Sequence, residues 1–234
     1  MLGILGGMGP LATVDFLEKL VRNTPATRDQ DHIETLVCSA ARIPDRIAGM
    51  TGEGPDPFPA MLAALRRLEA GGATRIAIAC NTAHHWHGAL QAETKLPILH
   101  IVDAVADALD GRTGDAIGLL ATNGMLRSGI YQRRLGELGF ACVVPDAADQ
   151  AEVVRAIALV KRGGVAEASE ILRPRVEALV AAGCRRVVMA CTEIPIALAG
   201  AESALSAALL DPTEALARAC IAACLGEWRI ANGE

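Results

Sequence analysis

The sequence predicts an α/β fold of two similar Rossmann-like domains, each built around a parallel sheet. Short, β-branched apolar runs alternate with stretches of helical periodicity, the alternation restarts near mid-chain, and a matching segment ends in a cysteine in each half. Strands alternating with helices indicate parallel βαβ units. A length of 234 residues suits one large domain or two small ones. We therefore expect two domains related by a pseudo-twofold axis, with the active site in the cleft between them.

The first half contains four apolar runs and three stretches of helical period. The runs predict buried strands at Leu2–Leu5, Thr35–Ser39, Arg75–Ala79 and Ile98–Ile101. The periodic stretches predict helices at Ala12–Val21, Pro59–Ala70 and Ala83–Glu93. Between them, Gly52–Pro59 is rich in glycine and proline, which is typical of an exposed loop.

The second half repeats this pattern. Strands are predicted at Ala116–Ala121, Ala141–Val144 and Arg186–Ala190, and helices at Gly129–Leu138, Gln150–Lys161 and Val165–Ala182. Pro174 lies inside the last helix and should kink or split it, because proline lacks a backbone donor. A C-terminal helix at Pro212–Trp228 is expected to pack back onto the first half. The predicted domains are therefore residues 1–102 with about 208–234, and residues 103–207, joined near Val102–Gly114.

Composition excludes several classes of protein. Apolar residues make up 52% of the chain, which excludes a disordered protein. The net charge of −5 and the absence of a basic stripe argue against nucleic acid as a partner. No apolar run reaches the roughly 20 residues of a membrane span, and the first residues do not resemble a signal peptide. Seven cysteines, an odd number, favour reduced thiols in the cytoplasm over a disulfide framework.

Cys80 and Cys191 end the matching segments and carry the strongest functional signal. Each follows an apolar run that a Gly-x-x-Arg pattern introduces, and polar residues come directly after it. Because ligands bind beyond the carboxyl ends of parallel strands, the pair predicts two acid–base groups that approach one cleft. A helix beginning after each strand should lower both thiol pKa values. The other cysteines fit small, buried core residues, as free cysteine commonly does: Cys38, Cys142, Cys184, Cys220 and Cys224.

Paired thiols suit the inversion of an amino acid at its Cα atom. The Cα proton is weakly acidic, and one group must remove it from one face while a second returns a proton to the other. A thiol pKa of about 8.5 can be tuned toward the working pH. Donors around the substrate carboxylate must stabilise the charge that develops there. No lysine motif for pyridoxal phosphate (PLP) is evident, so no cofactor is expected.

Two other motifs have weaker support. Gly7-x-Gly9-x-x-Ala12 formally matches a dinucleotide-binding fingerprint, but no acidic residue ends the next strand. The same glycines could offer N–H groups to a small carboxylate. Cys80 and His84 lie four residues apart, as helix-borne metal ligands would, yet no CxxC or HExxH companion accompanies them. A zinc site needs further ligands, so no metal is predicted.

Three segments resemble the signature segments of the aspartate/glutamate racemase family, most closely its aspartate racemase branch: Ile4–Thr13, Cys80–His84 and Ala190–Pro195. The resemblance covers most of the chain. It implies a PLP-independent amino-acid racemase with two α/β domains, usually a homodimer, in which Cys80 and Cys191 are the catalytic bases. Arg46 and Lys161 match the positions that hold the side-chain carboxylate of a dicarboxylic amino acid.

The resemblance also implies which residues surround the substrate. Positions that line the site or cradle the α-carboxylate are matched by Met8, Gly9, Asn81, Thr82, Thr122 and Thr192. The residues expected directly behind these are His84, Glu193 and Met125. Among the histidines, His84 is expected to lie nearest the cleft. Both cysteines are present, so the chain does not show the loss of one cysteine found in relatives with other chemistry, such as decarboxylation.

Met125 departs from the family pattern and leaves the substrate open. The family commonly has a second threonine there, and a thioether cannot donate the hydrogen bond that a hydroxyl would. Aspartate is the predicted substrate, and the alternatives are glutamate, another amino acid or a hydantoin. Rival functions from other classes are a non-catalytic amino-acid-binding protein and a metal hydrolase. The sequence does not assign either thiol to one enantiomer.

Overall fold

The computed structural model describes residues 1–109, 114–200 and 203–232, and the chain divides into two compact units. Unit 1 comprises Met1–Ala104 and Thr213–Glu234, and unit 2 comprises Val105–Pro212. Residues 110–113 of the expected connection, and residues 233–234 of the expected first domain, lie outside the described residues.

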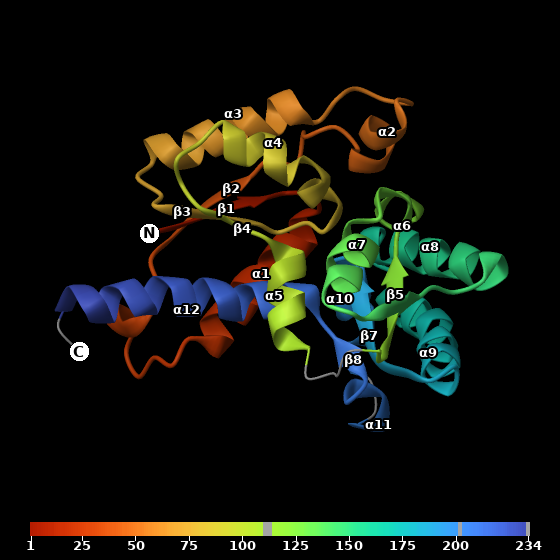
Figure 1. Ribbon diagram of the computed structural model, residues 1–234. Helices are drawn as coiled ribbons and strands as arrows, with labels where there is room; N and C mark the ends of the chain where they lie inside the picture. Colours follow the sequence, from red (N-terminus) through yellow and green to blue (C-terminus); the bar gives the residue numbers. More distant parts are fainter. Residues whose placement is uncertain (110–113, 201–202, 233–234) are drawn as a thin grey trace. The chain divides into compact units, whose positions relative to one another are not determined.

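Unit 1 is built on a parallel sheet with strand order β2-β1-β3-β4 (Figure 1). Its strands are β1 (Leu2–Gly6), β2 (Thr35–Ser39), β3 (Arg75–Ile78) and β4 (Ile98–Leu99). The segments between them form α1 (Pro10–Asn23), the 3₁₀ turn η1 (Asp29–Asp31), α2 (Arg46–Thr51), α3 (Phe58–Ala70), the 3₁₀ helix η2 (Thr82–Trp86) and α4 (His87–Ala92), and α5 (Ile101–Ala108) follows β4. Every residue of β1 and β3 is buried, as expected for strands covered on both faces.

Unit 2 repeats the topology, with strand order β6-β5-β7-β8 and every pair parallel. Its strands are β5 (Ala116–Ala121), β6 (Ala141–Val143), β7 (Cys184–Ala190) and β8 (Leu209–Leu210). Its helices are α6 (Asn123–Ser128), α7 (Ile130–Glu137), α8 (Ala147–Lys161), α9 (Val165–Ala181), α10 (Glu193–Leu198) and α11 (Ser203–Ser206). Two four-stranded parallel sheets of the same order confirm the predicted fold class.

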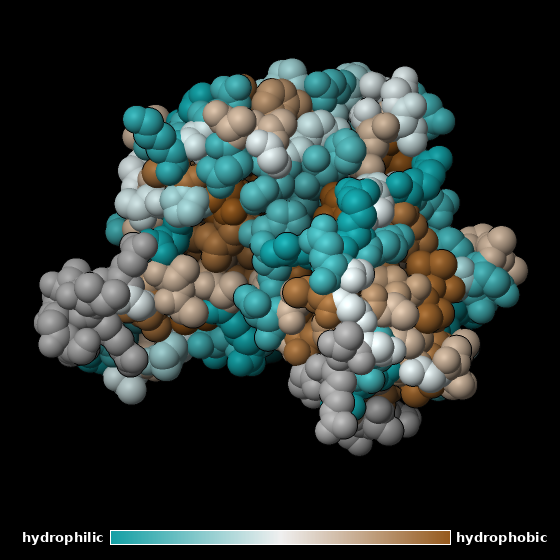
Figure 2. Space-filling view, in the orientation of Figure 1, coloured by the Kyte–Doolittle hydropathy of each residue, from teal (hydrophilic) through white to brown (hydrophobic). Residues whose placement is uncertain are grey.

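Helix α12 (Pro212–Asn232) belongs to unit 1 from Thr213 onward. The ammonium of Lys19 in α1 donates to the Thr213 hydroxyl over 2.7 Å, and the Asn23 side-chain amide donates to Glu214 over 3.0 Å. These bonds fasten the beginning of α12 to α1. No described helix is both long enough and apolar enough to cross a membrane, and hydrophilic residues are spread over the face in Figure 2.

Several predicted elements differ in the structure. The predicted buried strand β2 alternates between exposed and partly exposed residues, because it lies at the edge of its sheet. The predicted strand Ile98–Ile101 shortens to two residues, and Ile101 instead begins α5, which occupies much of the expected connection. The predicted helix Ala83–Glu93 is a 3₁₀ helix followed by the short α4. Sequence periodicity did not predict α2, α6, α10 or α11, each of six residues or fewer.

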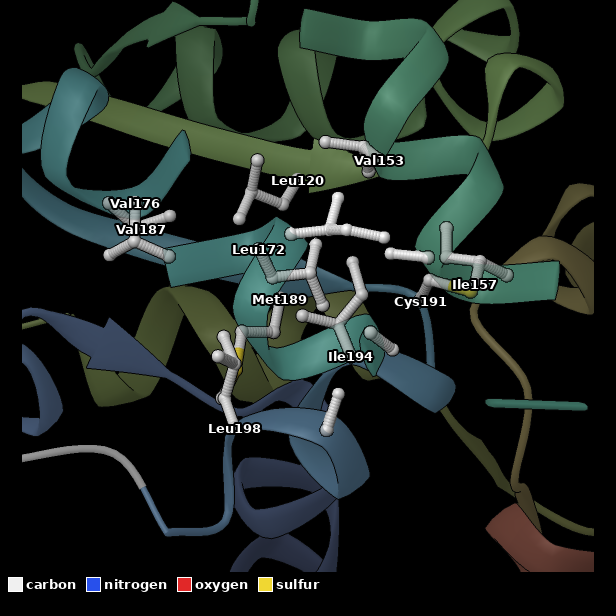
Figure 3. Packing of buried hydrophobic residues seen from close by; sticks show 14 of the residues in the cluster. Leu120, Val153, Ile157, Leu172, Val176, Val187, Met189, Cys191, Ile194 and Leu198 are labelled. Atoms are coloured by element: carbon white, nitrogen blue, oxygen red, sulfur yellow. The ribbon is translucent and has the colours of Figure 1, made fainter. Parts of the chain in front are cut away.

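Pro174 does not split α9, which continues through it from Val165 to Ala181. A proline inside a helix costs about 3 kcal/mol because one hydrogen bond is lost and the ring crowds the preceding turn. The helix is held by its packing on both sides of the proline. Leu172 and Val176 are fully buried in the hydrophobic cluster of unit 2 (Figure 3).

Cysteine burial also differs from the prediction. Cys184 and Cys220 are buried, but Cys38, Cys142 and Cys224 are partly exposed. Cys38 lies on the edge strand β2 and Cys142 on β6, the corresponding edge strand of unit 2. An edge strand leaves side chains uncovered that a central strand would bury.

Candidate functional site

Both matched cysteines lie at the same place in their respective sheets. Cys80 follows β3 after one residue, and Cys191 follows β7 directly. Strand order reverses between β1 and β3 in unit 1 and between β5 and β7 in unit 2. Open α/β sheets bind ligands outside the carboxyl ends of the strands at such a switch point. Each unit therefore presents one cysteine at its preferred ligand-binding edge.

Cys80 is 5% exposed and packs with the hydrophobic cluster of unit 1. Its backbone N–H donates to the carbonyl of Ile78 over 2.8 Å. Asn81 and Thr82 follow it and are 2% and 8% exposed, so both enter η2 as buried polar residues. Helix α2, which begins at Arg46, contacts η2.

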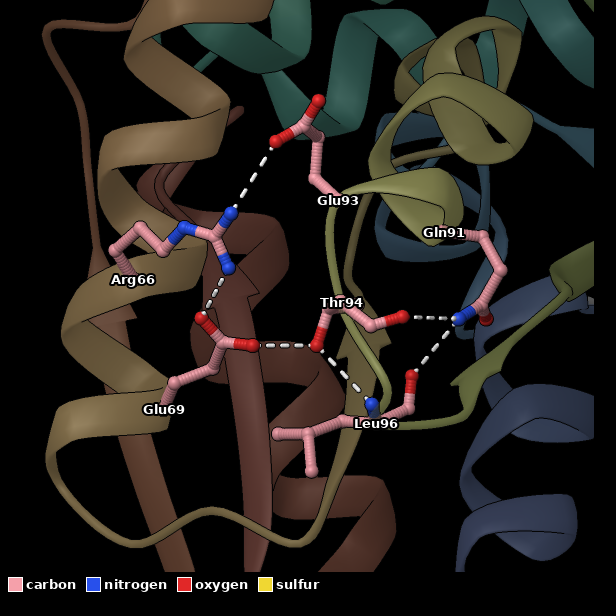
Figure 4. Close-up of polar contacts among 6 residues, drawn as sticks. All are labelled: Arg66, Glu69, Gln91, Glu93, Thr94 and Leu96. Carbon is pink, nitrogen blue, oxygen red and sulfur yellow. Dashed lines mark hydrogen bonds and ion pairs between the residues drawn. The ribbon is translucent and has the colours of Figure 1, made fainter.

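The end of α4 and the turn after it are fastened to α3 by a polar network (Figure 4). Arg66 bridges Glu69 in the same helix over 2.8 Å and Glu93 over 3.2 Å. The Thr94 hydroxyl donates to Glu69, and the Gln91 amide donates to the Thr94 carbonyl over 3.3 Å. These contacts hold the end of α4 and the turn that leads into β4.

The glycine loop after β1 lies beside the β3 end, because the Ala79 N–H donates to the Leu5 carbonyl over 3.1 Å. Thr13 closes the loop. Its hydroxyl accepts from the Gly7 N–H at 2.8 Å and donates to the Gly9 carbonyl at 3.0 Å. Gly7 has a φ of 88°, and a Cβ there would lie 2.5 Å from the Ala40 nitrogen. Only glycine fits, for reasons of both conformation and space.

We expect Gly7→Ala to destabilise the protein by more than about 2 kcal/mol, since left-handed strain and a backbone clash act together. Gly72→Ala is the matched control, because Gly72 has the same φ of 88° but a Cβ added there would meet no atom within 4 Å. Conformational strain alone costs about 1 kcal/mol there. Thermal unfolding of both variants measures the difference, and equal losses in melting temperature would contradict the steric argument.

Met8, which the sequence predicts to line the substrate site, has a side chain that is 2% exposed and packs with Leu5, Ile43 and Met61 in the core cluster. Gly9 caps the N-terminus of α1 and is partly exposed. An apolar side chain this close to the core contributes more by burial than by exposure to a polar ligand.

Arg46 is held in place at the start of α2. The Asp45 carboxylate caps this helix by accepting from the Ile47 and Ala48 N–H groups, both at 2.9 Å. One Arg46 terminal nitrogen donates to the carbonyls of Ile43 and Pro44, at 3.2 and 2.9 Å. Its Nε is buried without a hydrogen-bond partner in the described part of the chain. The guanidinium is therefore oriented with donor capacity left over, as a carboxylate-binding group requires.

Cys191 of unit 2 lies against a carboxylate. Its thiol donates to Glu193 Oε2 over 3.0 Å, and the Thr192 hydroxyl donates to the same oxygen over 3.2 Å. Lys161 Nζ lies 4.0 Å from the other oxygen, Oε1. Glu193 is 5% exposed and Cys191 6%, whereas the Lys161 side chain is 46% exposed. Four predicted site residues of this unit thus form one contiguous group.

This environment corrects the predicted thiol pKa. Burial, then the charge and hydrogen bond of Glu193, raise the pKa of Cys191 well above its ordinary value. The Glu193 backbone N–H at the start of α10 and the Lys161 ammonium act in the opposite direction but are outweighed. Cys191 is therefore a neutral thiol near pH 7. The sequence includes Glu193 but carries no signal that its side chain turns back onto the cysteine.

Thr122 follows β5 at the point where Ala121 pairs with Ala190, immediately before Cys191. Its hydroxyl accepts from the Met125 N–H at 3.1 Å and caps α6. Met125 is 1% exposed, so its side chain packs inside unit 2. The Gln150 amide, which sequence analysis did not single out, donates to the Ala121 carbonyl over 2.9 Å and shapes the same strand end.

His84, predicted to lie behind the substrate-binding residues and to be the histidine nearest the cleft, is 3% exposed, and both of its ring nitrogens contact backbone groups. Its ring lies 5.1 Å from that of His100 and 5.9 Å from that of His87. Among the described residues, no three His, Cys, Asp or Glu side chains form a group that could hold a metal ion.

A family model described as Asp/Glu/hydantoin racemase matches residues 5–220. The chain belongs to the Asp/Glu/hydantoin racemase family. The predicted family and enzyme class, an amino-acid racemase, are thereby confirmed.

Other members of the racemase family match over nearly the whole chain. The solved aspartate racemase of Picrophilus torridus is 34% identical, with a TM-score of 0.84, and the match covers 96% of this chain and 94% of that one. The broad specificity amino-acid racemase RacX of Bacillus subtilis is 26% identical over 227 residues, 94% of this chain and 96% of that protein. A glutamate racemase of Francisella tularensis, solved with D-glutamate, is 15% identical with a TM-score of 0.69 and shows the fold alone.

Proposed function

We propose that this racemase acts on aspartate without PLP, and that Cys80 and Cys191 exchange the Cα proton of one bound substrate. The observation that carries the proposal is the placement of one buried cysteine at the switch point of each sheet. The likeness to the Picrophilus torridus aspartate racemase supports the choice of substrate.

The proposed proton transfers start from the protonation state of Cys191. We propose that turnover of one enantiomer starts with Cys191 as the neutral thiol, which its raised pKa favours, and with Cys80 as the base. The Cα–H bond breaks as the Cys80 S–H bond forms, and the Cys191 S–H bond breaks as a new Cα–H bond forms on the opposite face. The other enantiomer runs the same steps in reverse. After turnover of the first enantiomer, Cys80 carries the proton from Cα and Cys191 is the thiolate, which is the form that starts turnover of the other enantiomer. Before the first enantiomer turns over again, Cys80 releases its proton to solvent, and Cys191 takes one from solvent through Glu193.

Donors near the two strand ends are proposed to stabilise the carbanion at the substrate carboxylate. The proposed groups are the Gly9 backbone N–H and the side chains of Asn81, Thr82, Thr122 and Thr192. Backbone and hydroxyl donors aimed at developing negative charge are the usual means of stabilising such a state. The buried positions of Asn81, Thr82 and Thr192 favour this role, because hydrogen bonds strengthen where water is excluded.

The substrate side-chain carboxylate is proposed to bind Arg46, and Lys161 supplies a second cation. We expect Arg46→Met to raise KM for aspartate about 10- to 100-fold, since a hydrogen bond to a charged group contributes about 1.5–3 kcal/mol. Arg42→Met is the matched control, because Arg42 is exposed and lies just before α2. Circular dichroism of aspartate follows the interconversion, and an unchanged KM in Arg46→Met would remove Arg46 from the site.

The decisive experiment measures deuterium uptake at Cα in heavy water. Aspartate, glutamate, several neutral amino acids and a hydantoin are compared by proton NMR. The proposal expects the fastest uptake with both enantiomers of aspartate, and a faster rate with another compound would reassign the substrate. No uptake with any compound would favour a binding protein, whereas activity lost to a chelator would favour a metal enzyme.

We further propose a homodimer in the cytoplasm. None of the seven cysteines, all in the described ranges, forms a disulfide, which suits a reducing compartment. Sedimentation equilibrium tests the dimer.

A further inference from the structure

We propose that His84 is a positioning residue for Cys80, whose carbonyl it holds through a neutral imidazole anchored on α5. The inference rests on the proposed role of Cys80 as a base. It adds a residue that touches neither substrate nor thiol but determines where the thiol lies.

The need for this support comes from the shape of η2. In an α-helix the His84 N–H would bond the carbonyl of Cys80, four residues earlier. In the 3₁₀ geometry of η2 it bonds the Asn81 carbonyl instead, over 3.1 Å. The carbonyl of Cys80 lies 2.9 Å from Nδ1 of the His84 side chain.

The other ring nitrogen fixes the tautomer. His84 Nε2 accepts from the backbone N–H of Ile101, the first residue of α5, over 3.1 Å. A backbone N–H can only donate, so the bond from Ile101 requires Nε2 without a proton, and the bond to the Cys80 carbonyl, which can only accept, requires the proton on Nδ1. Both bonds form only with the neutral Nδ1–H form.

The surroundings keep the imidazole neutral. Burial, followed by the charge effects of His100 and His87, lowers the pKa of His84 to about 3 and outweighs the hydrogen bonds to the backbone of Cys80 and Leu99, which raise it. His100 Nδ1 accepts from the Val102 N–H over 3.2 Å, and His87 Nε2 lies 2.8 Å from the Ile98 carbonyl. The bridge from Cys80 to Ile101 therefore persists throughout the neutral range.

The bridge links Cys80 to the helix through which the chain leaves unit 1. The boundary between the units falls between Ala104 and Val105, inside α5. A displacement of the start of α5 would pull on the imidazole and hence on the carbonyl of Cys80. Because a misplacement of about 1 Å can cost a reaction on the order of 100-fold, a small shift suffices to affect proton transfer.

Single-thiol backgrounds test the role on each cysteine separately. In Cys191→Ala, deuterium uptake at Cα depends on Cys80 alone, and in Cys80→Ala it depends on Cys191 alone. His84→Asn places an amide N–H where Nδ1 donates but cannot reach Ile101. His84→Gln places its amide near the position of Nε2 and gives up the donor at Nδ1. His85→Asn is the matched control, because His85 is exposed.

We expect His84→Gln, which gives up the donor to the Cys80 carbonyl, to slow Cys80-dependent uptake about tenfold. His84→Asn, which keeps that donor, should slow it less than about threefold. Both values lie in the range expected for loss of one neutral hydrogen bond. Neither change should affect uptake that depends on Cys191. Equal slowing in both backgrounds, or none in either, would overturn the positioning role. Absence of uptake in wild type as well would instead count against the proposed racemase mechanism.

A measurement on the wild type needs no variant to fold. Proton–nitrogen correlation spectra of ¹⁵N-histidine-labelled protein report the tautomer of each ring. We expect the neutral Nδ1–H form of His84 from pH 5 to pH 8. An imidazolium, or a proton on Nε2, in that range would contradict the bridge directly.

Discussion

Replacing either Cys80 or Cys191 with alanine will abolish racemisation of aspartate but leave Cα proton exchange with one enantiomer only. Inversion needs a base on one face and an acid on the other, and alanine removes one of them. General acid–base groups each contribute about 10²- to 10⁴-fold, so a loss of about 10³-fold or more in kcat is expected. The remaining thiol can still exchange the proton of the enantiomer that presents its Cα–H to it.

The two variants should therefore show opposite enantiomer preferences. Circular dichroism measures racemisation, and proton NMR in heavy water measures exchange of L- and D-aspartate separately. Cys184→Ala, in the strand that leads to Cys191, and Cys38→Ala, in the strand next to β1, are the matched controls and should racemise normally. Normal racemisation by either Cys80→Ala or Cys191→Ala would exclude the two-thiol mechanism.

Local patterns were sufficient to predict most of the fold. Continuous apolar runs such as Leu2–Gly6 and Ala116–Ala121 can be buried only in the middle of a covered sheet, and both occupy that position. Position within the sheet was harder to predict. Thr35–Ser39 has an equally β-prone composition. Which strand lies at the edge depends on pairing between segments that are distant in the sequence, and the edge position leaves Thr35–Ser39 partly exposed.

The sequence predicted which residue types follow the strand ends, but it did not predict the directions of their side chains. The sequence places Glu193 two residues after Cys191, which is compatible with a side chain pointing toward or away from the thiol. The structure turns it toward the thiol, where its charge and hydrogen bond add to burial, the largest cause, in raising the pKa of Cys191. Met8 is a second case, because a loop residue with a long apolar side chain can reach back into the core. Such outcomes depend on tertiary packing rather than on a local motif.

Glu193→Gln will lower kcat/KM for aspartate about 10- to 100-fold, because the amide keeps the shape of the side chain but cannot accept the proton of Cys191. L- and D-aspartate have equal free energies in water, so kcat/KM must fall by the same factor in both directions. Glu177→Gln, on the exposed side of α9, is the control and should behave as wild type. Progress curves from each enantiomer measure both directions, and an unequal fall would point to a faulty assay rather than to the enzyme.

The pH profile separates this role from a purely structural one. In the proposed mechanism, the alkaline limb of kcat/KM reports the thiol that must stay protonated in the free enzyme, and for the enantiomer whose turnover starts on Cys80 this thiol is Cys191. The negative charge of Glu193 raises the pKa of that thiol, and the positive charge of Lys161, which lies beside the Glu193 carboxylate, lowers it. Glu193→Gln should therefore move the limb to lower pH, and Lys161→Met should move it to higher pH. Cys191 remains buried in both variants, so its pKa does not return fully to the ordinary thiol value in either.

If Lys161 also binds the substrate carboxylate, KM rises in Lys161→Met as well, but the direction in which the alkaline limb moves is unchanged. Shifts of the same sign in the two variants would mean that packing, not charge, controls Cys191.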